Sequence, residues 1–338
     1  MRKPVALITG AAGEIGHALI DDLAREGRAS IVTLDTKPLG DEQQKKVARA
    51  FLGSILDKNL LDQILAEFEV DTIFHLAALL STRSELVPVT AHQVNVEGTL
   101  NLLEFAQAES MSHGAKVIFF YPSSIAAYGM PDLATKARAG KVKEEDYNTP
   151  ITMYGCNKLY CEHLGRYYNL HYKQLDAGPQ SHRVDFRGIR FPGLISAITV
   201  PSGGTSDFAP EMIHAAAQGT PYACFVREDA RIPFMAMPDA VDAILGLVRA
   251  DAAKLTKTTY NIGAFNPSAG EVGALVKKAF PGAQITYTPD VKRQGIVDSW
   301  PADVDDSAAR TDWGFAPKFD LERGFGEYLI PTIRKRYA

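Results

Sequence analysis

The chain has 338 residues, of which 46% are hydrophobic and 22% are charged, and its formal net charge is -4. This composition excludes an intrinsically disordered chain, and the absence of any block of like charge argues against binding to nucleic acid or to an anionic membrane surface. Small molecules are therefore the expected ligands.

Neither a metal site nor a disulfide framework is expected. The three cysteines, Cys156, Cys161 and Cys224, lack C-x-x-C spacing, and the eight histidines lack the spacing of metal ligands. The N-terminal residues MRKP run directly into the apolar stretch VALITG, without the pattern of a signal peptide, and no apolar run is long enough to span a bilayer. We therefore expect a cytoplasmic protein.

Apolar stretches alternate with helical stretches through the first half of the chain. Strands are predicted at residues 5–10, 31–35, 72–78 and 116–124. Helices are predicted after Gly13, over 94–108 and over 151–170, and a polar loop is predicted after residue 35. Because strands separated by helices form parallel sheets with both faces covered, the pattern predicts a doubly wound α/β fold of the Rossmann type.

The composition of the sequence changes after Arg190, where a segment rich in proline and glycine begins. We predict a dinucleotide-binding domain over 1–190, to which some later segments return. Residues 191–338 are predicted to form mainly a smaller α/β substrate lobe, with a helix over 236–250.

The first predicted strand ends in TGAAGEIG, with glycines at positions 10, 13 and 16. Glycines allow the backbone to turn sharply and approach a pyrophosphate, which the N-terminus of the next helix attracts. Asp35 ends the following strand, where a carboxylate accepts hydrogen bonds from the adenosine ribose. The alternative is an ordinary tight turn and a strand-end aspartate, but the two features together favour a nicotinamide dinucleotide.

The stretch MYGCNK places Tyr154 four residues before Lys158, so both side chains lie on one face of a helix. On its own, this spacing is more often a packed or solvated helix face than a catalytic pair. Ser123 and Ser124 end the strand upstream, and serines at the carboxyl end of a parallel strand face the same crevice as the glycine turn. Either of these adjacent hydroxyls is a candidate for the site.

Five motifs together resemble the extended short-chain dehydrogenase/reductases, the NAD-dependent epimerase/dehydratase family: TGxxGxxG, HLAA (75–78), VNVEGT (94–99), PSS (122–124) and YxxxK (154–158). The resemblance implies that Tyr154 is the general base, that Lys158 lowers its pKa and holds the nicotinamide ribose, and that Ser124 orients the substrate oxygen, with Ser123 as its competitor. It assigns NAD binding to Gly10, Gly13, Glu14, Ile15, Gly16, Asp35, Ser54, Ile55, Leu76, Ala77, Ala78, Asn95, Tyr154, Lys158 and Pro192.

Later motifs resemble the short-chain L-threonine 3-dehydrogenase branch of this family, namely RFPGLIS, SGGTSDFAPEM, CFVREDARIPFMAMPDA, IVDSWP and DDSAARTDWGF. This likeness implies oxidation of L-threonine by NAD without a metal, in a homodimer built on the helices at 94–108 and 151–170. It assigns substrate contacts to Ser81, Ser123, Ser124, Tyr154, Gly193, Thr205, Ser206 and Trp300.

Some of these residues have simpler interpretations. The side chains at 205–207 are also suited to capping the following helix. Trp300 is equally suited to packing in a core. The segment 131–148 is either a lid over the cofactor or a solvated basic loop.

Two features depart from the family pattern. The connection at 171–188 is longer than the family link, so we expect an added surface loop there. Ser54 stands where many relatives have an acidic residue against the adenine.

Three rival functions remain open at this stage. Two are enzymatic: a nucleotide-sugar epimerase or dehydratase on the same scaffold, and a dehydrogenase of another small hydroxy acid. The third is a dinucleotide-sensing regulator without catalysis. The intact Ser124, Tyr154 and Lys158 set argues against the regulator.

Overall fold

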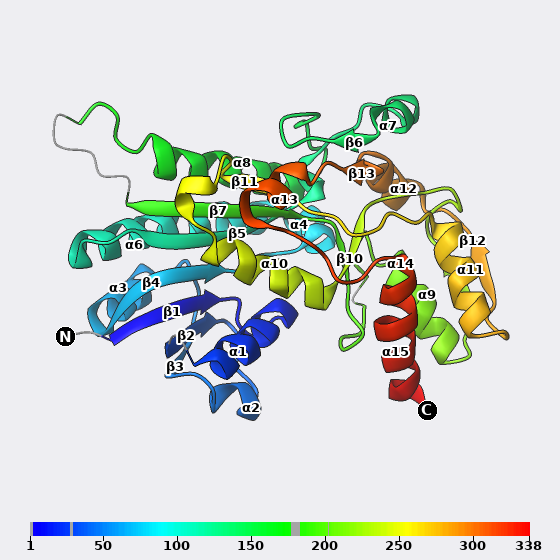
Figure 1. Ribbon diagram of the computed structural model, residues 1–338, viewed down its shortest axis with the longest axis horizontal. Helices are drawn as coiled ribbons and strands as arrows, with labels where there is room; N and C mark the ends of the chain where they lie inside the picture. The colour runs from blue at the N-terminus through cyan, green and yellow to red at the C-terminus, as the bar shows by residue number, and fades with distance from the viewer. Residues whose placement is uncertain (1–2, 28–29, 177–182, 202) are drawn as a thin grey trace.

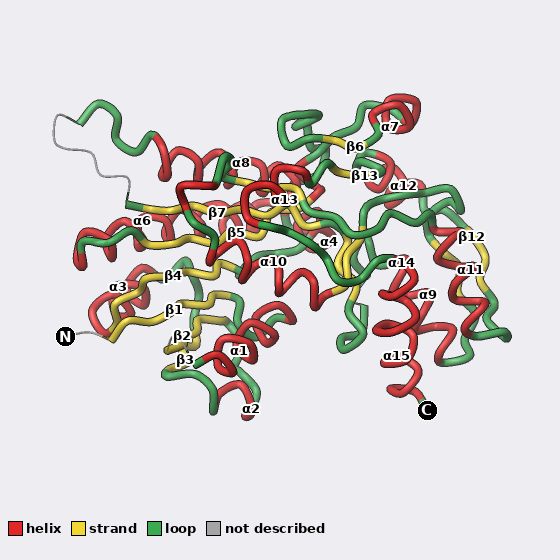
Figure 2. The backbone as a smooth tube through the Cα atoms, viewed as in Figure 1, coloured by secondary structure: helices red, strands yellow, loops and turns green. Residues whose placement is uncertain are grey.

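The computed structural model describes residues 3–27, 30–176, 183–201 and 203–338. A large parallel sheet with helices on both faces forms one end of the molecule (Figure 1). A smaller group of helices and two-stranded sheets forms the other end (Figure 2). The doubly wound α/β fold predicted from the sequence is confirmed.

The large sheet contains seven parallel strands in the order β11-β7-β5-β4-β1-β2-β3. The order reverses between β1 and β4, and ligands of such sheets bind beyond the carboxyl ends of the strands near this switch. The strands are β1 (Lys3–Thr9), β2 (Ser30–Asp35), β3 (Arg49–Leu52), β4 (Phe68–His75), β5 (Val117–Ser124), β7 (Val184–Phe191) and β11 (Thr259–Asn261).

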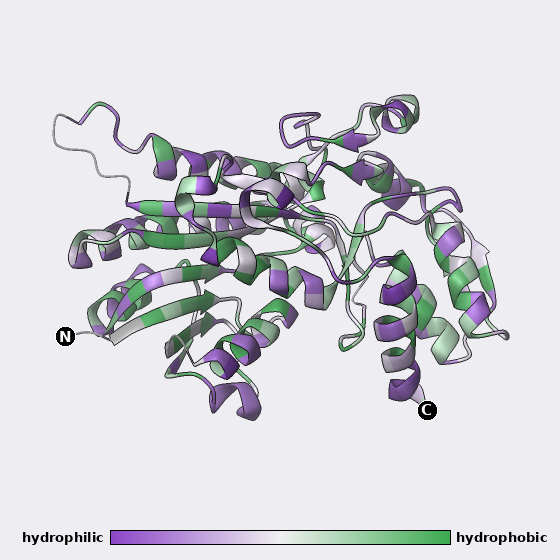
Figure 3. Ribbon diagram, viewed as in Figure 1, coloured by the Kyte–Doolittle hydropathy of each residue, from purple (hydrophilic) through white to green (hydrophobic). Residues whose placement is uncertain are grey.

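Helices cover both faces of this sheet. Along β1, Ala6 and Ile8 join the core under α1 and α10, whereas Val5 and Leu7 join the core under α3 and α6. The first face carries α1 (Glu14–Glu26), α10 (Met237–Arg249) and α13 (Ser307–Trp313), and the second carries α3 (Lys58–Glu67), α6 (Gly98–His113) and α8 (Met153–Leu170). Apolar residues concentrate along the central strands, as expected for a sheet buried on both faces (Figure 3).

The smaller lobe has a separate apolar core, which includes Phe208, Phe234 and Trp300. Its strands pair as β8 with β10, β9 with β12 and β6 with β13. They are β6 (Lys141–Val142), β8 (Gly193–Ile195), β9 (Tyr222–Cys224), β10 (Phe234–Ala236), β12 (Ile285–Tyr287) and β13 (Asp303–Val304). The longer helices around them are α7 (Leu133–Ala139), α9 (Phe208–Ala217), α11 (Ala269–Ala279), α12 (Val291–Asp298) and α15 (Ile330–Tyr337).

Short helical elements complete the chain. They are α2 (Asp41–Gln44), α4 (Ser81–Leu86), α5 (Pro88–His92), the π-helical turn η1 (Gln93–Glu97), η2 (Ile125–Ala127), η3 (Ala252–Lys254), α14 (Leu321–Arg323) and η4 (Gly324–Leu329). Within the described ranges, no helix is both long and apolar enough to cross a lipid bilayer.

Several local predictions were wrong. The polar loop expected after Asp35 contains α2 and the edge strand β3, and the strand expected over 72–78 ends at His75 because the chain turns there towards α4. The helix expected over 94–108 begins as a π-helical turn and continues to His113. Part of the predicted insertion at 171–188 is strand β7, which begins at Val184, while residues 177–182 lie outside the described residues.

Gly155 lets the first turn of α8 lie directly against η2. A methyl group at this position would lie 2.0 Å from Ala126 O and 2.8 Å from Pro150 Cβ. We expect Gly155→Ala to lower the free energy of unfolding by roughly 1–3 kcal/mol, as overpacking does, in urea denaturation.

The matched control is Gly295→Ala, which lies inside α12 with no atom within 4 Å of an added methyl group. Because alanine favours the helix, this variant should be neutral or more stable by about 0.5–1 kcal/mol. If both variants were as stable as the parent, the contact between α8 and η2 would be looser than described.

Candidate active site

The glycine turn lies between the carboxyl ends of β1 and β4. Gly10 has a φ of +69°, and a Cβ there would lie 2.5 Å from Ala77 N, so only glycine allows the segment at 76–78 to come this close. Gly13 is the N-cap of α1, and among the described residues no side chain caps this helix. Its first amide groups, which belong to residues 14–16, are therefore available to an anion.

Asp35 stands at the end of β2, beside the glycine turn. Its Oδ2 accepts a hydrogen bond from Ala12 N at 2.9 Å, and its Oδ1 accepts one from Lys37 N at 2.8 Å. The carboxylate is therefore held in place next to the turn, where a dinucleotide ribose would lie.

Ser54 and Ile55 follow β3 in the same region. Ser54 Oγ accepts a hydrogen bond from Leu56 N at 3.1 Å, so this hydroxyl stabilises its own turn. Ile55 is buried and packs against Gly98. An adenine contact at Ser54 stays a prediction.

Asn95 fixes the loop that follows β4. Its side chain accepts a hydrogen bond from Leu79 N at 2.8 Å and donates one to Leu79 O at 3.0 Å. Asn95 is buried in the π-helical turn η1, so its amide acts on the loop at 76–79 rather than standing free in the crevice.

His75, from the HLAA motif, joins this loop to η1. Its Nδ1 lies 2.9 Å from Thr9 Oγ1 and its Nε2 lies 2.9 Å from Thr99 Oγ1. Because Thr99 donates its own proton to Asn95 O, it accepts from His75 Nε2–H, which leaves Nδ1 to accept from Thr9. Burial, followed by the charge of Lys158, lowers the pKa of His75 to about 3, so the ring is neutral.

Ser124, Tyr154 and Lys158 come together where β5 ends and α8 begins. A hydrogen bond joins the side chains of Ser124 and Tyr154. Lys158 is buried, donates to Pro122 O at 2.6 Å, and places Nζ 5.4 Å from the centre of the Tyr154 ring. The same ammonium lies 4.7 Å from the ring centre of Tyr121. A phenol, a hydroxyl and a cation therefore share one small site.

The two adjacent serines differ in their partners. Ser124 Oγ accepts from Ala126 N at 3.1 Å, which leaves its proton for Tyr154. Ser123 is buried and donates to the carboxylate of Glu162. This arrangement favours Ser124 over Ser123 as the hydroxyl that meets a substrate.

Burial dominates the ionisation of the pair. It raises the pKa of Tyr154 well above its usual value, and the hydrogen bond from Ser124 only partly opposes this. Burial also lowers the pKa of Lys158 to about 8, while Cys161 and Glu162 act in the opposite direction. Without a ligand, the phenol is therefore protonated near neutral pH.

Several of the predicted substrate residues come from distant segments of the chain and lie close together. Ser81, the first residue of α4, and Thr205 approach within 3.5 Å through their hydroxyl groups. Pro192, between β7 and β8, and Gly193, the first residue of β8, are both buried. A Cβ at Gly193 would lie 3.5 Å from Ser206 Cβ. Segments more than a hundred residues apart therefore meet at this point.

The structure also bears on the simpler interpretations of the segment at 205–207, of Trp300 and of the segment at 131–148. Asp207 is the N-cap of α9 but makes no side-chain cap hydrogen bond to that helix; instead its Oδ2 accepts from Gly204 N at 2.7 Å. Trp300 is buried in the core of the smaller lobe, against which Tyr154 also packs. The segment at 131–148 is not simply a solvated loop, because Lys136 is buried and donates to Val297 O at 2.9 Å.

Sequence reasoning missed four residues that support the site: His75, Tyr121, Glu162 and Arg190. Glu162 could have been found, since it continues the spacing of Tyr154 and Lys158 by four more residues along α8. The partners of Glu162 lie on other elements, and no local spacing reveals them.

The model of the NAD-dependent epimerase/dehydratase family matches residues 6–263, which is more than half of the chain. The chain belongs to this family. An uncharacterised epimerase/dehydratase of Staphylococcus haemolyticus is 35% identical in an alignment of 336 residues that covers 98% of this chain and 98% of that protein. The cofactor is NAD, and the uncapped N-terminus of α1 beside Asp35 fits a dinucleotide.

Two solved structures are similar over nearly their whole length. The holo form of a GalE-like L-threonine dehydrogenase from Cupriavidus necator has a TM-score of 0.84 at 35% identity, with 96% of this chain and 99% of that chain covered. A monomeric L-threonine 3-dehydrogenase from a metagenome has a TM-score of 0.84 at 33% identity, with 99% and 100% covered.

Asp35 should make the protein prefer NAD to NADP, because its carboxylate would repel a 2′-phosphate and lose its ribose hydrogen bonds. We expect kcat/KM to be at least about tenfold higher with NAD, and Asp35→Ala to remove most of this preference. Steady-state kinetics with both cofactors measure the ratio.

Asp41→Ala is the matched control, because it removes the same charge from an exposed position at the start of α2. It should keep the preference for NAD. Equal efficiency of the unmodified protein with the two cofactors would contradict the role of Asp35.

Proposed function

We propose that this protein oxidises the 3-hydroxyl group of L-threonine to give 2-amino-3-oxobutanoate, with NAD as the hydride acceptor. The observation that carries the proposal is the meeting of Ser124, Tyr154 and Lys158. The hydroxyls of Ser81 and Thr205 approach each other at the start of α4, a helix that packs against α8. The similarity to L-threonine dehydrogenases over nearly the whole chain supports the same substrate.

Tyr154 would remove the proton from the substrate hydroxyl while Ser124 holds the substrate oxygen by a hydrogen bond. Bound NAD supplies the hydride acceptor and a positive charge beside the phenol. Lys158 adds a second positive charge and a donor for the nicotinamide ribose, and both charges favour the phenolate. Together they would oppose the effect of burial, which otherwise keeps Tyr154 protonated.

The other side of the crevice suits a small polar substrate. Ser81, Thr205 and Ser206 offer short hydroxyl side chains for the amino and carboxylate groups of an amino acid. Arg293, a cation that contacts this loop, already donates to Gly204 O at 2.7 Å and stacks on Phe225. A nucleotide sugar would need cations for its diphosphate, so the crevice favours the amino acid.

Tyr154→Phe keeps the ring and most of its packing but removes the ionisable oxygen. We expect it to fold and bind NAD, while kcat/KM for L-threonine falls by ~10²–10⁴-fold or more.

The pH profile is a second prediction. In the unmodified protein kcat/KM should rise with pH as the phenol of Tyr154 ionises. It should fall again above the pKa of Lys158, which is about 8 before any ligand binds. Both measurements follow the reaction by the absorbance of the NADH that is formed.

A panel of amino acids, hydroxy acids and nucleotide sugars in the same assay distinguishes the rival functions. NADH formation with L-threonine would exclude a regulator without catalysis. A Tyr154→Phe variant that folds, binds NAD and oxidises L-threonine within a few-fold of the unmodified protein would contradict the mechanism.

We also propose that the protein forms a homodimer through α6 and α8. These helices leave large apolar side chains exposed, including Leu100, Met111, Tyr160, Tyr167 and Leu170. A two-fold interface would bury one self-complementary patch of this kind.

One of the similar structures is named as a monomer, so the association needs a direct test. Light scattering at micromolar concentration should give twice 36.8 kDa, and Tyr160→Glu on α8 should shift the mass towards the monomer. Lys335→Glu on α15, outside this surface, is the control. A mass of 36.8 kDa for the unmodified protein would contradict the dimer.

A further inference from the structure

A buried ion pair lies directly behind the candidate catalytic residues. Glu162 follows Tyr154 and Lys158 at four-residue intervals along α8. Both of its carboxylate oxygens accept from Arg190, with Nε to Oε1 at 2.9 Å and Nη2 to Oε2 at 2.6 Å. Ser123 donates to the same carboxylate, and all three side chains are buried.

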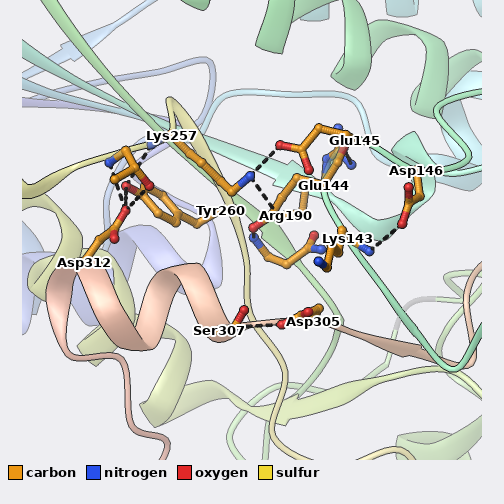
Figure 4. Close-up of polar contacts among 12 residues, drawn as sticks. Lys143, Glu144, Glu145, Asp146, Arg190, Lys257, Tyr260, Asp305, Ser307 and Asp312 are labelled. Atoms are coloured by element: carbon orange, nitrogen blue, oxygen red, sulfur yellow. Dashed lines mark hydrogen bonds and ion pairs between the residues drawn. The ribbon is translucent and has the colours of Figure 1, made fainter.

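Arg190 connects this pair to the segment at 141–148 and, through Glu144, to the end of β11. Its Nη1 donates to Glu144 O at 2.9 Å, and its guanidinium lies 4.6 Å from the ring centre of Tyr128. The Glu144 carboxylate accepts from Asn261 N at 3.1 Å and lies 3.5 Å from Lys257 Nζ. Figure 4 shows Lys257 between Glu144 and Glu145, with Arg190 beside them. Three strands of the sheet, α8 and the segment at 141–148 are thus joined.

The pair contacts both elements that carry the candidate catalytic residues. In the sheet, Ser123 of β5 is the register partner of Arg190 of β7. Ser124 follows Ser123 directly, so fixing the Ser123 side chain fixes the peptide that carries Ser124. Glu162 belongs to the same helix as Tyr154, so its bonds hold this helix against the end of β5.

Stability alone is a weak reason for such a pair. Removing two charges from water is costly, and well-packed apolar residues at buried ion pairs often give equal or greater stability. The pair also contacts Ser123, the neighbour of Ser124, and belongs in part to the helix of Tyr154, which suggests a role in the geometry and charge of the site.

The charge of Glu162 also reaches Lys158, one turn earlier on α8. Burial lowers the pKa of Lys158, whereas Cys161 and Glu162 raise it. The groups that face Lys158 from the packed elements are Tyr121 of β5, His75 of β4, and Tyr154, Cys161 and Glu162 of α8. Of the two groups that raise the pKa of Lys158, Cys161 has the larger effect, but burial raises the pKa of its own thiol, so near neutral pH Glu162 is the charged one of these two groups.

We propose that Glu162 and Arg190 are positioning residues, which set the geometry of Ser124 and Tyr154 through Ser123 and keep Lys158 charged. This inference rests on the proposed use of Ser124, Tyr154 and Lys158 in catalysis. Glu162 acts through its neighbours, because its carboxylate is occupied by Ser123 and Arg190.

The first test is Glu162→Gln, which keeps the shape and removes the charge. We expect kcat for L-threonine to fall at least about tenfold with a smaller change in KM, since misplaced catalytic groups lower turnover. We also expect the alkaline limb of the pH profile to move down by roughly half a pH unit to one unit, because Lys158 loses its balancing charge. Unchanged kcat and an unchanged limb would overturn the proposal.

A second readout is independent of the substrate. Calorimetric titration gives the Kd of NAD at a series of pH values, and affinity should decrease as Lys158 loses its proton. In Glu162→Gln this decrease should begin at lower pH, and in Lys158→Met it should be absent. If L-threonine is not oxidised, but the affinity of Glu162→Gln for NAD still begins to decrease at lower pH, the substrate assignment fails and the positioning role stands. If L-threonine is oxidised but the decrease does not shift, the positioning role fails.

Asp185→Asn is the matched control. Asp185 pairs with Arg187 on the same strand, and the Arg187 side chain is as buried as that of Arg190. Arg187 contacts the carbonyl oxygens at the end of α10, on the opposite face of the sheet. We expect this variant to lose stability without moving the pH profile or the pH dependence of NAD binding.

Ser123→Ala tests the positional part should Glu162→Gln fail to fold, because it leaves the ion pair intact. We expect kcat to fall severalfold while KM changes little. Full kcat in this variant would show that Ser124 does not depend on its neighbour, and would overturn that part of the proposal.

Discussion

The candidate site depends on the close approach of α8 to the carboxyl end of β5. Gly155 makes this approach possible, since a Cβ there would lie 2.0 Å from Ala126 O. The same approach brings the phenol of Tyr154 to the hydroxyl of Ser124. Thr152 begins the helix at this point by accepting a hydrogen bond from Gly155 N at 3.0 Å. Helix capping, close packing and catalytic geometry are therefore set by the same few residues.

The smaller lobe is tied to this contact. Met130 N donates to Ser299 O at 2.7 Å, and Lys136 Nζ donates to Val297 O at 2.9 Å, so the chain beyond Ser124 is held to the end of α12. Trp300 follows directly and belongs to the core against which Tyr154 packs. Thr82 Oγ1 donates to Gly203 O at 3.1 Å, which links α4 to the loop with Thr205. The smaller lobe and the loop with Thr205 are thus attached to the segment after β5 and to α4.

The sequence was most informative where a function needs local spacing. The glycine turn, Asp35 at a strand end and the Tyr154–Lys158 pair all lie within short segments. Apolar runs between helical stretches predicted β1, β2, β4 and β5, whereas the start of β7 was assigned to an added loop. Edge strands were less visible: β3 has only four residues, and β11 has three and lies far along the chain. β3 is stabilised by pairing with β2, and β11 by pairing with β7, so the local sequence of these short strands does not predict them.

The orientation of the two serines could not be predicted for a similar reason. In an extended strand, adjacent side chains point to opposite faces, and the sequence does not say which face holds the partner. The carboxylate that binds Ser123 lies 39 positions away on α8, and its own partner Arg190 lies 28 positions further along. Such buried pairs are satisfied only in the folded chain, so their role became visible with the structure.

The central claim is that a hydride leaves C3 of L-threonine for NAD in this crevice. L-threonine carrying deuterium at C3 tests it most directly, with mass spectrometry of the reduced cofactor as the readout. The account predicts that deuterium appears in NADH. In a parallel reaction with the Tyr154→Phe variant, stopped after the same time, no labelled NADH should be detected. Unlabelled NADH, or no NADH from L-threonine at all, would contradict it.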